Sequence, residues 1–189
     1  MKLLWTGTDS LMLLDVSRQP LKKKIYWIIF RVLARIIDVF ADEHYCDSEN
    51  VADNVRKFGM KKKISVVPDK LNHTDKYPKI DHDGFNVIYY LPNCNKDKKF
   101  KEWLYGYDVF KKISSTMPYV NFVILDGTNN MEEIYPLTDF YLRPNRHDGA
   151  SRMVQECKIQ QIPYYHSVTD PNFEEAIKSI NEAYRKQLG

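Results

Sequence analysis

The segment DFYLRPNRHDGASRMVQECKIQQIPYYH, residues 139–166, decides the fold that we expect for this chain. Its first four residues are predominantly apolar and predict a buried strand, after which a polar loop begins. A helical pattern starts at Gly149 or Ala150 and continues to residue 158, and residues 162–166 form a second strand. A strand, a helix and another strand in this order predict parallel pairing, because parallel strands need a crossover connection.

The same alternation extends through the rest of the chain. Further strands are predicted at residues 2–5, 43–46, 63–67, 85–91 and 120–125, and further helices at residues 21–40, 48–58, 107–116, 131–135 and 171–187. A lysine-rich loop is predicted before residue 107. Residues 69–84 are polar, lack periodicity and contain proline and glycine, so we predict a linker there. The expected fold class is α/β, with a mainly parallel sheet.

Two acids frame the predicted helix start, and they are the first candidate for a functional site. Asp148 and Glu156 are separated by seven residues, just beyond the end of a strand. A helix N-terminus offers free N–H groups and a partial positive charge to phosphate, and an acid two turns further on can accept hydrogen bonds from sugar hydroxyls. The alternative is an ordinary strand–loop–helix turn in which an acid interacts with the helix dipole. Residues that would assist a phosphate site are Gly149, Ser151, Arg143 and Arg146.

Composition limits the other functional classes. The 189 residues are 43% hydrophobic and carry a formal charge of only +3, which is too small to imply a nucleic-acid partner. The charge is uneven: residues 1–79 have 15 Lys/Arg against 10 Asp/Glu (net +5), and residues 80–189 have 13 against 15 (net −2). Cys46, Cys94 and Cys157 show no C-x-x-C spacing, so we expect no disulfide framework and no zinc site. Without a signal peptide pattern, a cytoplasmic location is expected.

A resemblance to a known family accounts for the acid pair. Asp148-Gly149, seven residues and then Glu156 resemble the donor-site signature of GT-B glycosyltransferases of the group 1 type, which are similar to glycosyltransferase family 4. The strand at residues 161–165 resembles the Gly-x-Pro-Val-Ile strand of that family, with Gln161 in place of glycine. Residues 122–127 resemble the preceding strand, which ends in glycine. The match covers roughly residues 85–189, so a Rossmann-like donor-binding domain is implied there.

The resemblance also implies roles for individual residues. Glu156 would bind the ribose of a nucleotide diphosphate sugar, and Asp148 would position the sugar; Asp148 and Arg146 are the expected catalytic residues. The diphosphate would lie near the helix start and near basic side chains. These donor-binding residues are Gly149, Ala150, Ser151, Arg152, Arg143, Lys98, Lys99 and Gly127. Lys96 and Lys101 lie in the same basic region. No metal or other cofactor is expected.

Residues 1–68 fit the same family as a partial acceptor-side α/β segment. The expected function is therefore the donor-binding half of a glycosyltransferase that moves a sugar onto an acceptor hydroxyl, in polysaccharide or glycolipid synthesis. A protein that supplies the acceptor domain is an expected partner. The alternative is a non-catalytic nucleotide-sugar-binding or scaffold subunit of a split glycosyltransferase.

The predicted helix at residues 21–40 is the second notable feature. Lys22-Lys23-Lys24 precede an aromatic and aliphatic run that contains Arg31 and Arg35. A basic amphipathic helix of this kind can lie on an anionic membrane surface. The alternative is a helix that packs on the sheet or on another domain. We therefore expect peripheral contact with the inner face of a membrane as one interpretation.

Overall fold

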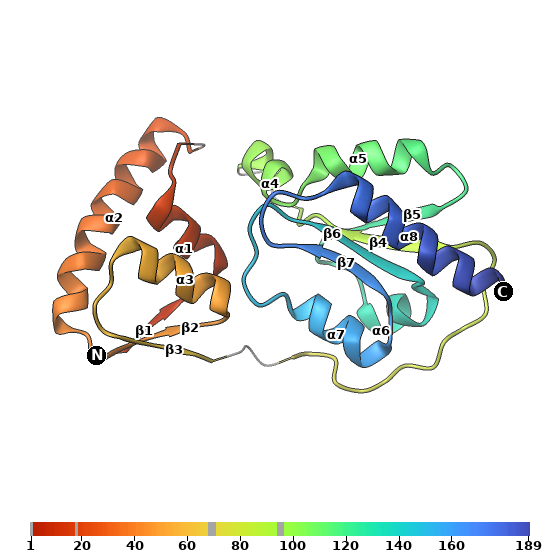
Figure 1. The fold of residues 1–189 in the computed structure, drawn as a ribbon, viewed down its shortest axis with the longest axis horizontal. Coiled ribbons are helices and arrows are strands. Elements are labelled where there is room, and N and C mark those ends of the chain that lie inside the picture. The colour runs from red at the N-terminus through yellow and green to blue at the C-terminus, as the bar shows by residue number, and fades with distance from the viewer. Residues whose placement is uncertain (1, 18, 68–70, 94–96) are drawn as a thin grey trace. The chain divides into compact units, whose positions relative to one another are not determined.

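The computed structural model describes residues 2–17, 19–67, 71–93 and 97–189 (Figure 1). The chain forms two compact units, Met1–Lys70 with His147–Ala150, and Leu71–Arg146 with Ser151–Gly189. Most of the segment that was predicted as a linker, from Leu71 onward, belongs to the second unit; residues 69 and 70 lie outside the described residues. Across the described part of the chain, no helix combines the length and apolarity needed to cross a membrane.

The first unit contains a parallel three-stranded sheet in the order β1-β2-β3. Its strands are β1 (Lys2–Trp5), β2 (Glu43–Cys46) and β3 (Lys63–Val66), and its helices are α1 (Gly7–Leu14), α2 (Leu21–Phe40) and α3 (Glu49–Phe58). The core combines Trp5, Leu13, Ala34, Cys46, Val51 and Val55, so all three helices contribute to one apolar cluster.

Local signals define the ends of α3. The Ser48 side chain accepts a hydrogen bond from the Val51 backbone N–H, which satisfies one free donor of the first turn. Gly59 ends the helix in the left-handed conformation with φ of 90°, which a glycine adopts at little cost.

A buried polar chain fixes the end of α2 to the sheet. The indole Nε1–H of Trp5 donates to Nδ1 of His44 at 3.1 Å, which leaves the proton of the neutral ring on Nε2. His44 Nε2 lies 2.7 Å from Asp38 Oδ1, and the Lys61 backbone N–H donates to Asp38 Oδ2. Burial raises the pKa of Asp38, but the hydrogen bonds from His44 and from the Lys61 and Lys62 amides outweigh it, so the pKa is lowered overall.

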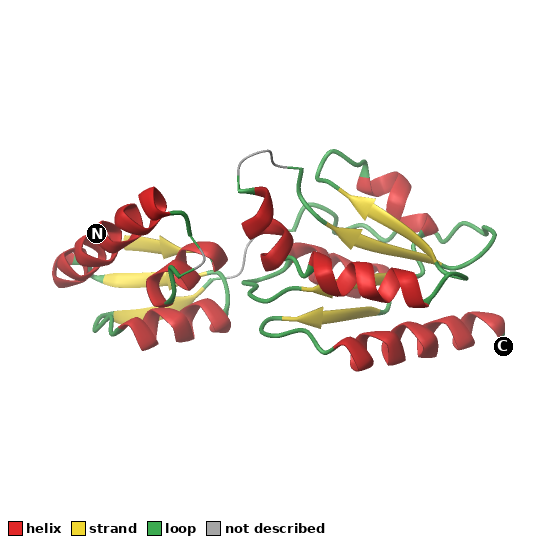
Figure 2. Ribbon diagram, turned by 90° about the horizontal axis from the view of Figure 1, so that it is seen from above, coloured by secondary structure: helices red, strands yellow, loops and turns green. Residues whose placement is uncertain are grey.

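The second unit contains a parallel four-stranded sheet in the order β5-β4-β6-β7 (Figure 2). The strands are β4 (Asn86–Tyr90), β5 (Asn121–Leu125), β6 (Phe140–Pro144) and β7 (Tyr164–Ser167). The helices are α4 (Lys98–Leu104), α5 (Tyr107–Thr116), α6 (Met131–Ile134), the 3-10 turn η1 (Tyr135–Leu137), α7 (Arg152–Gln160) and α8 (Phe173–Leu188).

Two apolar layers hold this sheet between helices. On one side α5 and α8 cover Val87, Tyr89, Phe140 and Leu142. On the other side α6, η1 and α7 cover Ile88 and Tyr141 (Figure 1). Because neighbouring residues of a strand point to opposite faces, both faces of β4 and β6 are apolar and buried. The predicted α/β class, with a Rossmann-like parallel sheet and flanking helices, is confirmed.

The structure corrects the predicted secondary structure at three places. Residues 7–14 form α1, for which no helix was predicted. The predicted lysine-rich loop contains α4, whose Phe100, Trp103 and Leu104 have helical spacing. Helix α7 begins at Arg152, two or three residues later than predicted, because the Ser151 hydroxyl caps it by accepting from the Val154 N–H.

Candidate functional site

The strand order creates a topological switch point at the carboxyl edge of the second sheet. The chain leaves β4 toward β5 on one side and then crosses from β5 to β6 on the other side of β4. In open parallel sheets, ligands bind outside the carboxyl ends of the strands at the place where the order reverses. The ends of β4 and β6 are therefore where this topology places a ligand site.

At the ends of β4 and β5 lies a cavity of about 240 Å³, lined by Leu91, Pro92, Asn93, Lys98, Lys101, Glu102 and Asp126. Two lysines of α4 and two acids, Glu102 and Asp126, line this cavity, so its positive and negative charges are equal in number. Lys98 is only weakly paired, 3.9 Å from Glu102. Hydrogen bonds from the Thr128 hydroxyl and amide hold the pKa of Asp126 below its usual range. Lys99, also predicted for the site, is exposed and does not line this cavity.

Gly127 follows β5 with φ of 97°, a conformation that favours glycine. A Cβ atom there would lie 3.3 Å from the Tyr90 hydroxyl. Because Gly127 has no side chain, the loop after β5 passes close to Tyr90 at the end of β4.

At the end of β6, Arg143 and Asn145 are both buried, with 9% and 2% of their surface exposed. The Arg143 guanidinium donates to the Tyr141 hydroxyl at 2.8 Å and lies 5.8 Å from the centre of the Tyr105 ring. Within the described residues, Asn145 Oδ1 has no hydrogen-bond donor. A buried acceptor without a donor is costly, so a ligand N–H or O–H is a natural partner for it.

Arg146 faces a different group from the one predicted. Its guanidinium binds both carboxylate oxygens of Asp108 at 2.7 Å and also donates to the Trp103 carbonyl. Hydrogen bonding to Arg146 lowers the pKa of Asp108, and the same pair raises the pKa of Arg146. The pair holds the α4–α5 segment near the end of β6, where Gly106 approaches the Pro144 carbonyl so closely that a Cβ atom would overlap it at 1.9 Å.

The predicted acid pair is divided between the two units. Asp148, Gly149 and Ala150 belong to the first unit, whereas Ser151, Arg152 and Glu156 belong to the second. The Asp148 backbone carbonyl accepts a hydrogen bond from the Asn50 side chain. A Cβ atom on Gly149 would lie 2.8 Å from a carboxylate oxygen of Asp47, so a glycine is needed there for packing alone.

Glu156 is buried and already hydrogen-bonded by protein groups. The Tyr135 hydroxyl donates to its Oε2 at 2.6 Å, and the Asn72 backbone N–H donates to its Oε1 at 3.2 Å. Burial, followed by the hydrogen bond to Glu156, raises the pKa of Tyr135. One turn further along α7, Gln160 accepts from the Tyr77 backbone N–H and donates to the Asp75 carbonyl. Helix α7 therefore binds the backbone of residues 72–77 at several points.

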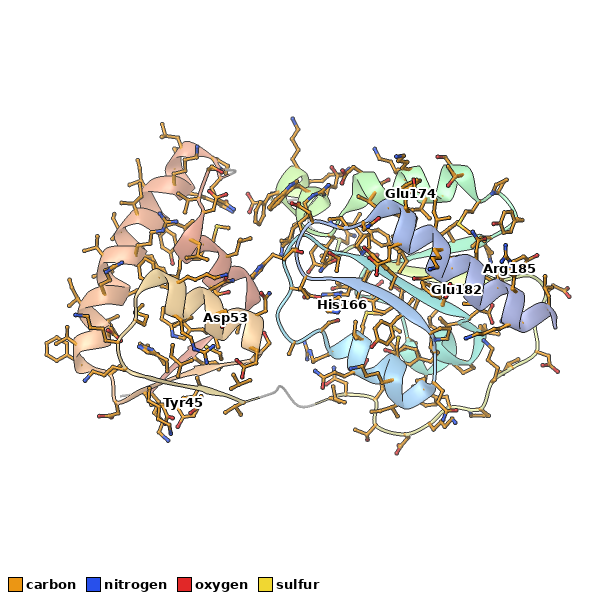
Figure 3. All side chains as sticks on the ribbon, in the orientation of Figure 1. Tyr45, Asp53, His166, Glu174, Glu182 and Arg185 are labelled. Carbon is orange, nitrogen blue, oxygen red and sulfur yellow. The ribbon has the colours of Figure 1, made fainter. Side chains whose placement is uncertain are left out.

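The structure thus places the sequence-predicted residues in several environments. Arg143, Lys98 and Gly127 lie at the strand ends of the second sheet, and Ser151 and Arg152 begin α7 on the same unit. Asn145 was not among the residues predicted for the site, whereas Tyr105 belongs to a group of tyrosines of which one was considered for stacking on a base. The signal for Asn145 was its position two residues after Arg143, because alternate residues of an extended strand share a face. His166, labelled on β7 in Figure 3, is the register partner of Arg143.

Other parts of the described chain offer no metal site, and a second cavity lies away from the carboxyl strand ends. Among the described residues, no group of three or more His, Cys, Asp or Glu side chains could hold a metal ion. A larger cavity, of about 600 Å³, lies at the opposite, amino edge of the second sheet, with Lys76, Tyr77, Thr138 and Pro163 in its wall. Cys46 and Cys157 are buried and free, and Cys94 and Lys96 lie outside the described residues.

Comparison with known proteins gives likeness of structure only. No protein-family model matches the chain, and no curated protein matches it. A chain in the crystal structure of the GtfA/B complex is similar over 79% of this chain and 39% of its own length, with 13% identity and a TM-score of 0.47. The lipopolysaccharide outer core galactosyltransferase WaaB, in its apo form, is similar over 80% of this chain and 55% of its own length, with 12% identity and a TM-score of 0.49.

The chain therefore spans about half or less of the length of these two structures. At such identities and TM-scores, the likeness says nothing about what this chain binds or transfers.

Proposed function

We propose that the second unit binds a nucleotide diphosphate sugar, as the donor-binding half of a glycosyltransferase that moves the sugar onto an acceptor hydroxyl. The observation that carries this proposal is the end of β6, where buried Arg143 and the partnerless acceptor Asn145 Oδ1 lie at the switch point of a parallel sheet. A guanidinium suits a phosphate group, and a neutral amide acceptor suits a base or sugar donor group. Lys98 and Lys101 add charge beside the neighbouring strand ends.

The proposed reaction requires stabilisation of the negative charge that develops on the departing diphosphate. When the bond between the sugar carbon and the phosphate oxygen breaks, negative charge grows on that oxygen. The acceptor oxygen forms the new bond to the sugar carbon, and the hydroxyl proton passes to the departing diphosphate or to water. Fixed positive groups that face this charge lower the barrier. The basic groups nearest the strand ends are Arg143, which also donates to the Tyr141 hydroxyl, and Lys98 and Lys101; the amides at the start of α7 lie on the same unit. Arg146 is bound to Asp108 and would first contribute through that pair.

The resemblance assigns the ribose to Glu156 and the sugar to Asp148, and both roles stay predictions. A carboxylate has about four lone-pair sites, so the two protein donors on Glu156 leave room for a ribose hydroxyl. A ribose hydroxyl bound to Glu156 would share this carboxylate with the Asn72 backbone N–H and could change the position of residues 71–77.

Calorimetry tests the donor site directly. The purified chain is titrated with UDP, GDP and their sugar derivatives, and with UMP and GMP to isolate the contribution of the second phosphate. Asn145→Ala should weaken binding about 2- to 12-fold, the loss of one neutral hydrogen bond. Asn121→Ala makes the same change at the amino end of β5 and should leave the affinity unchanged. Failure of every nucleotide to bind would sink the donor-site proposal.

A non-catalytic binding subunit is the second candidate. It is favoured by the pairing of Arg146, which places one of the two predicted catalytic residues in a bidentate ion pair with Asp108. Chromatography that measures the release of free sugar from the bound donor distinguishes an active transferase from a non-catalytic subunit. Binding without hydrolysis or transfer would support the subunit, and turnover would support the enzyme.

A further inference from the structure

Helix α2 has two charged residues, Arg31 and Asp38, on the side that packs against its own unit. Ala34 and Phe30 join the core of the first unit, and Asp38 is held by His44. Arg31 also faces inward, where its Nε–H donates to the Met12 carbonyl at 3.0 Å. These positions recur at intervals of three and four residues, so they form one face of the helix.

The opposite side of α2 is apolar and exposed along its whole length. Ten large apolar side chains there have between 48% and 75% of their surface exposed: Leu21, Ile25, Tyr26, Ile28, Ile29, Val32, Leu33, Ile36, Val39 and Phe40. At 100° per residue they cover an arc of about 160°. Their exposed area is on the order of 800 Å², which exceeds the largest apolar patch of a typical soluble monomer.

Helix α8, which is described along its whole length, does not show this arrangement. On α8, the exposed positions include Glu174, Glu182 and Arg185 (Figure 3). Its apolar residues Ala176 and Ile180 are buried, and Leu188 is exposed at the last turn. The exposed side of α8 is therefore mainly charged, whereas the exposed side of α2 is mainly apolar. The apolar surface of α2 is a property of that helix and not a general feature of the protein surface.

The charge around this patch indicates what covers it. Lys22, Lys23 and Lys24 form the first turn of α2, and Arg35 lies at the border of the apolar arc. The only acid of the helix, Asp38, is buried on the inner side. Residues 1–70 carry 13 Lys/Arg against 9 Asp/Glu, a net charge of +4. An apolar strip with positive charges at its end and border matches a bilayer with anionic headgroups.

The kinds of side chain agree with a lipid partner. Protein–protein hot spots are rich in tryptophan, tyrosine and arginine. In α2 the tryptophan and the inner arginine, Trp27 and Arg31, are half-buried on the inner side, and the outward strip is mostly aliphatic. Aliphatic side chains need no shape-matched pocket when they enter the acyl boundary of a bilayer.

We propose that α2 is a membrane-docking helix, which lies in the plane of an anionic bilayer with its ten outward apolar residues in the acyl boundary. The helix is about 30 Å long and would lie on the surface along its length. The proposal does not depend on the nucleotide site, because it concerns the other unit and needs no ligand. If both hold, donor transfer takes place at a membrane, which suits an acceptor carried on a lipid.

Vesicle sedimentation tests the proposal with the full chain and no nucleotide. Vesicles of phosphatidylcholine alone are compared with vesicles in which one third of the lipid is phosphatidylglycerol. The wild-type chain should sediment with the anionic vesicles. Lys22→Gln, Lys23→Gln and Lys24→Gln together should weaken this binding on the order of 100-fold, the effect of three lysines near a charged surface.

The apolar strip needs its own variant and control. Val32→Glu with Ile36→Glu should abolish vesicle binding, and because both side chains are exposed, the circular dichroism spectrum should stay unchanged. Ile124→Glu with Leu188→Glu makes the same change at exposed apolar positions of the second unit and should leave binding intact.

Three outcomes would overturn the proposal: no binding of the wild-type chain to anionic vesicles, full binding by the Val32/Ile36 variant, or a self-association in solution that disappears in that variant without any vesicle binding. The last outcome would assign the strip to a second copy of the chain. Because nucleotide calorimetry is measured separately, failure of the donor site leaves this result unaffected.

Discussion

Glu156 lends itself to a quantitative test, since each of its oxygens has a protein donor whose identity is known. In Glu156→Gln the side chain keeps its size, but the amide nitrogen cannot accept a hydrogen bond. Either the Tyr135 hydroxyl or the Asn72 N–H must then face an N–H group. We expect this single atom change to loosen the segment of residues 71–77, which α7 binds through Glu156 and Gln160.

The magnitude follows from the kind of hydrogen bond. A hydrogen bond to a charged acceptor contributes about 1.5–3 kcal/mol and one to a neutral acceptor about 0.5–1.5 kcal/mol, so removal of the charge should weaken the bond to the Asn72 amide by about 1 kcal/mol and increase its exchange about 5-fold. Tyr135→Phe should produce an effect in the same direction, because it removes the other donor that positions the carboxylate.

Hydrogen exchange, measured by mass spectrometry on peptides that cover residues 71–77, is the assay. Glu182→Gln makes the same substitution at an exposed position of α8 and should not change exchange in that segment. Unchanged protection of residues 71–77 in Glu156→Gln would refute the reasoning, since it would mean that the carboxylate does not hold the segment. Adding a nucleotide to the wild-type chain then shows whether ribose binding and the Asn72 contact compete.

Three further perturbations have defined outcomes. Gly106→Ala should destabilise the second unit by more than about 3 kcal/mol in urea unfolding, because its Cβ would overlap a backbone carbonyl, whereas Gly84→Ala, with a similar φ but nothing within 4 Å, should cost only about 1 kcal/mol. The pKa of Asp38 is lowered in the folded chain, so its ionised form stabilises the fold above the unfolded pKa near 4, and this contribution is lost as the pH falls through the folded pKa. In Asp38→Asn the free energy of unfolding should therefore depend less steeply on pH at the acid side. An unchanged dependence would exclude Asp38 as its source. In a double-mutant cycle, Asp108→Asn and Arg146→Gln should show a coupling energy of roughly 1 kcal/mol that shrinks in 1 M salt, and strict additivity would contradict the bidentate pair.

The elements of this fold were predictable wherever their signal is local. The strand boundaries at residues 2–5 and 43–46 match the prediction. For residues 2–5 the signal was a short apolar run that ends at a polar turn, which is a local property. Helix α4 was missed because its lysines suggested a solvated loop. Its apolar residues at positions 100, 103 and 104 have helical spacing, and they were the signal that could have revealed it.

The candidate site was less predictable, since its important properties depend on residues far apart in the chain. Nothing near position 145 in the sequence shows that Asn145 Oδ1 is buried without a donor, because that depends on how the ends of β4 and β6 are packed. The pairing of Arg146 with Asp108 joins positions 38 residues apart, and it changes which basic groups are available to a phosphate.

By itself, the sequence determined the alternation of strands and helices, the α/β class and the basic start of α2, because these follow from periodicity and composition along a continuous segment. Only the tertiary structure decided that Glu156 holds Asn72, 84 residues away, and that the apolar side of α2 faces outward with Arg31 and Asp38 inside. The physical reason is that periodicity shows that a helix has two sides, whereas burial depends on which side finds partners with complementary hydrogen bonds. In α2, those partners are the Met12 carbonyl and the His44 ring.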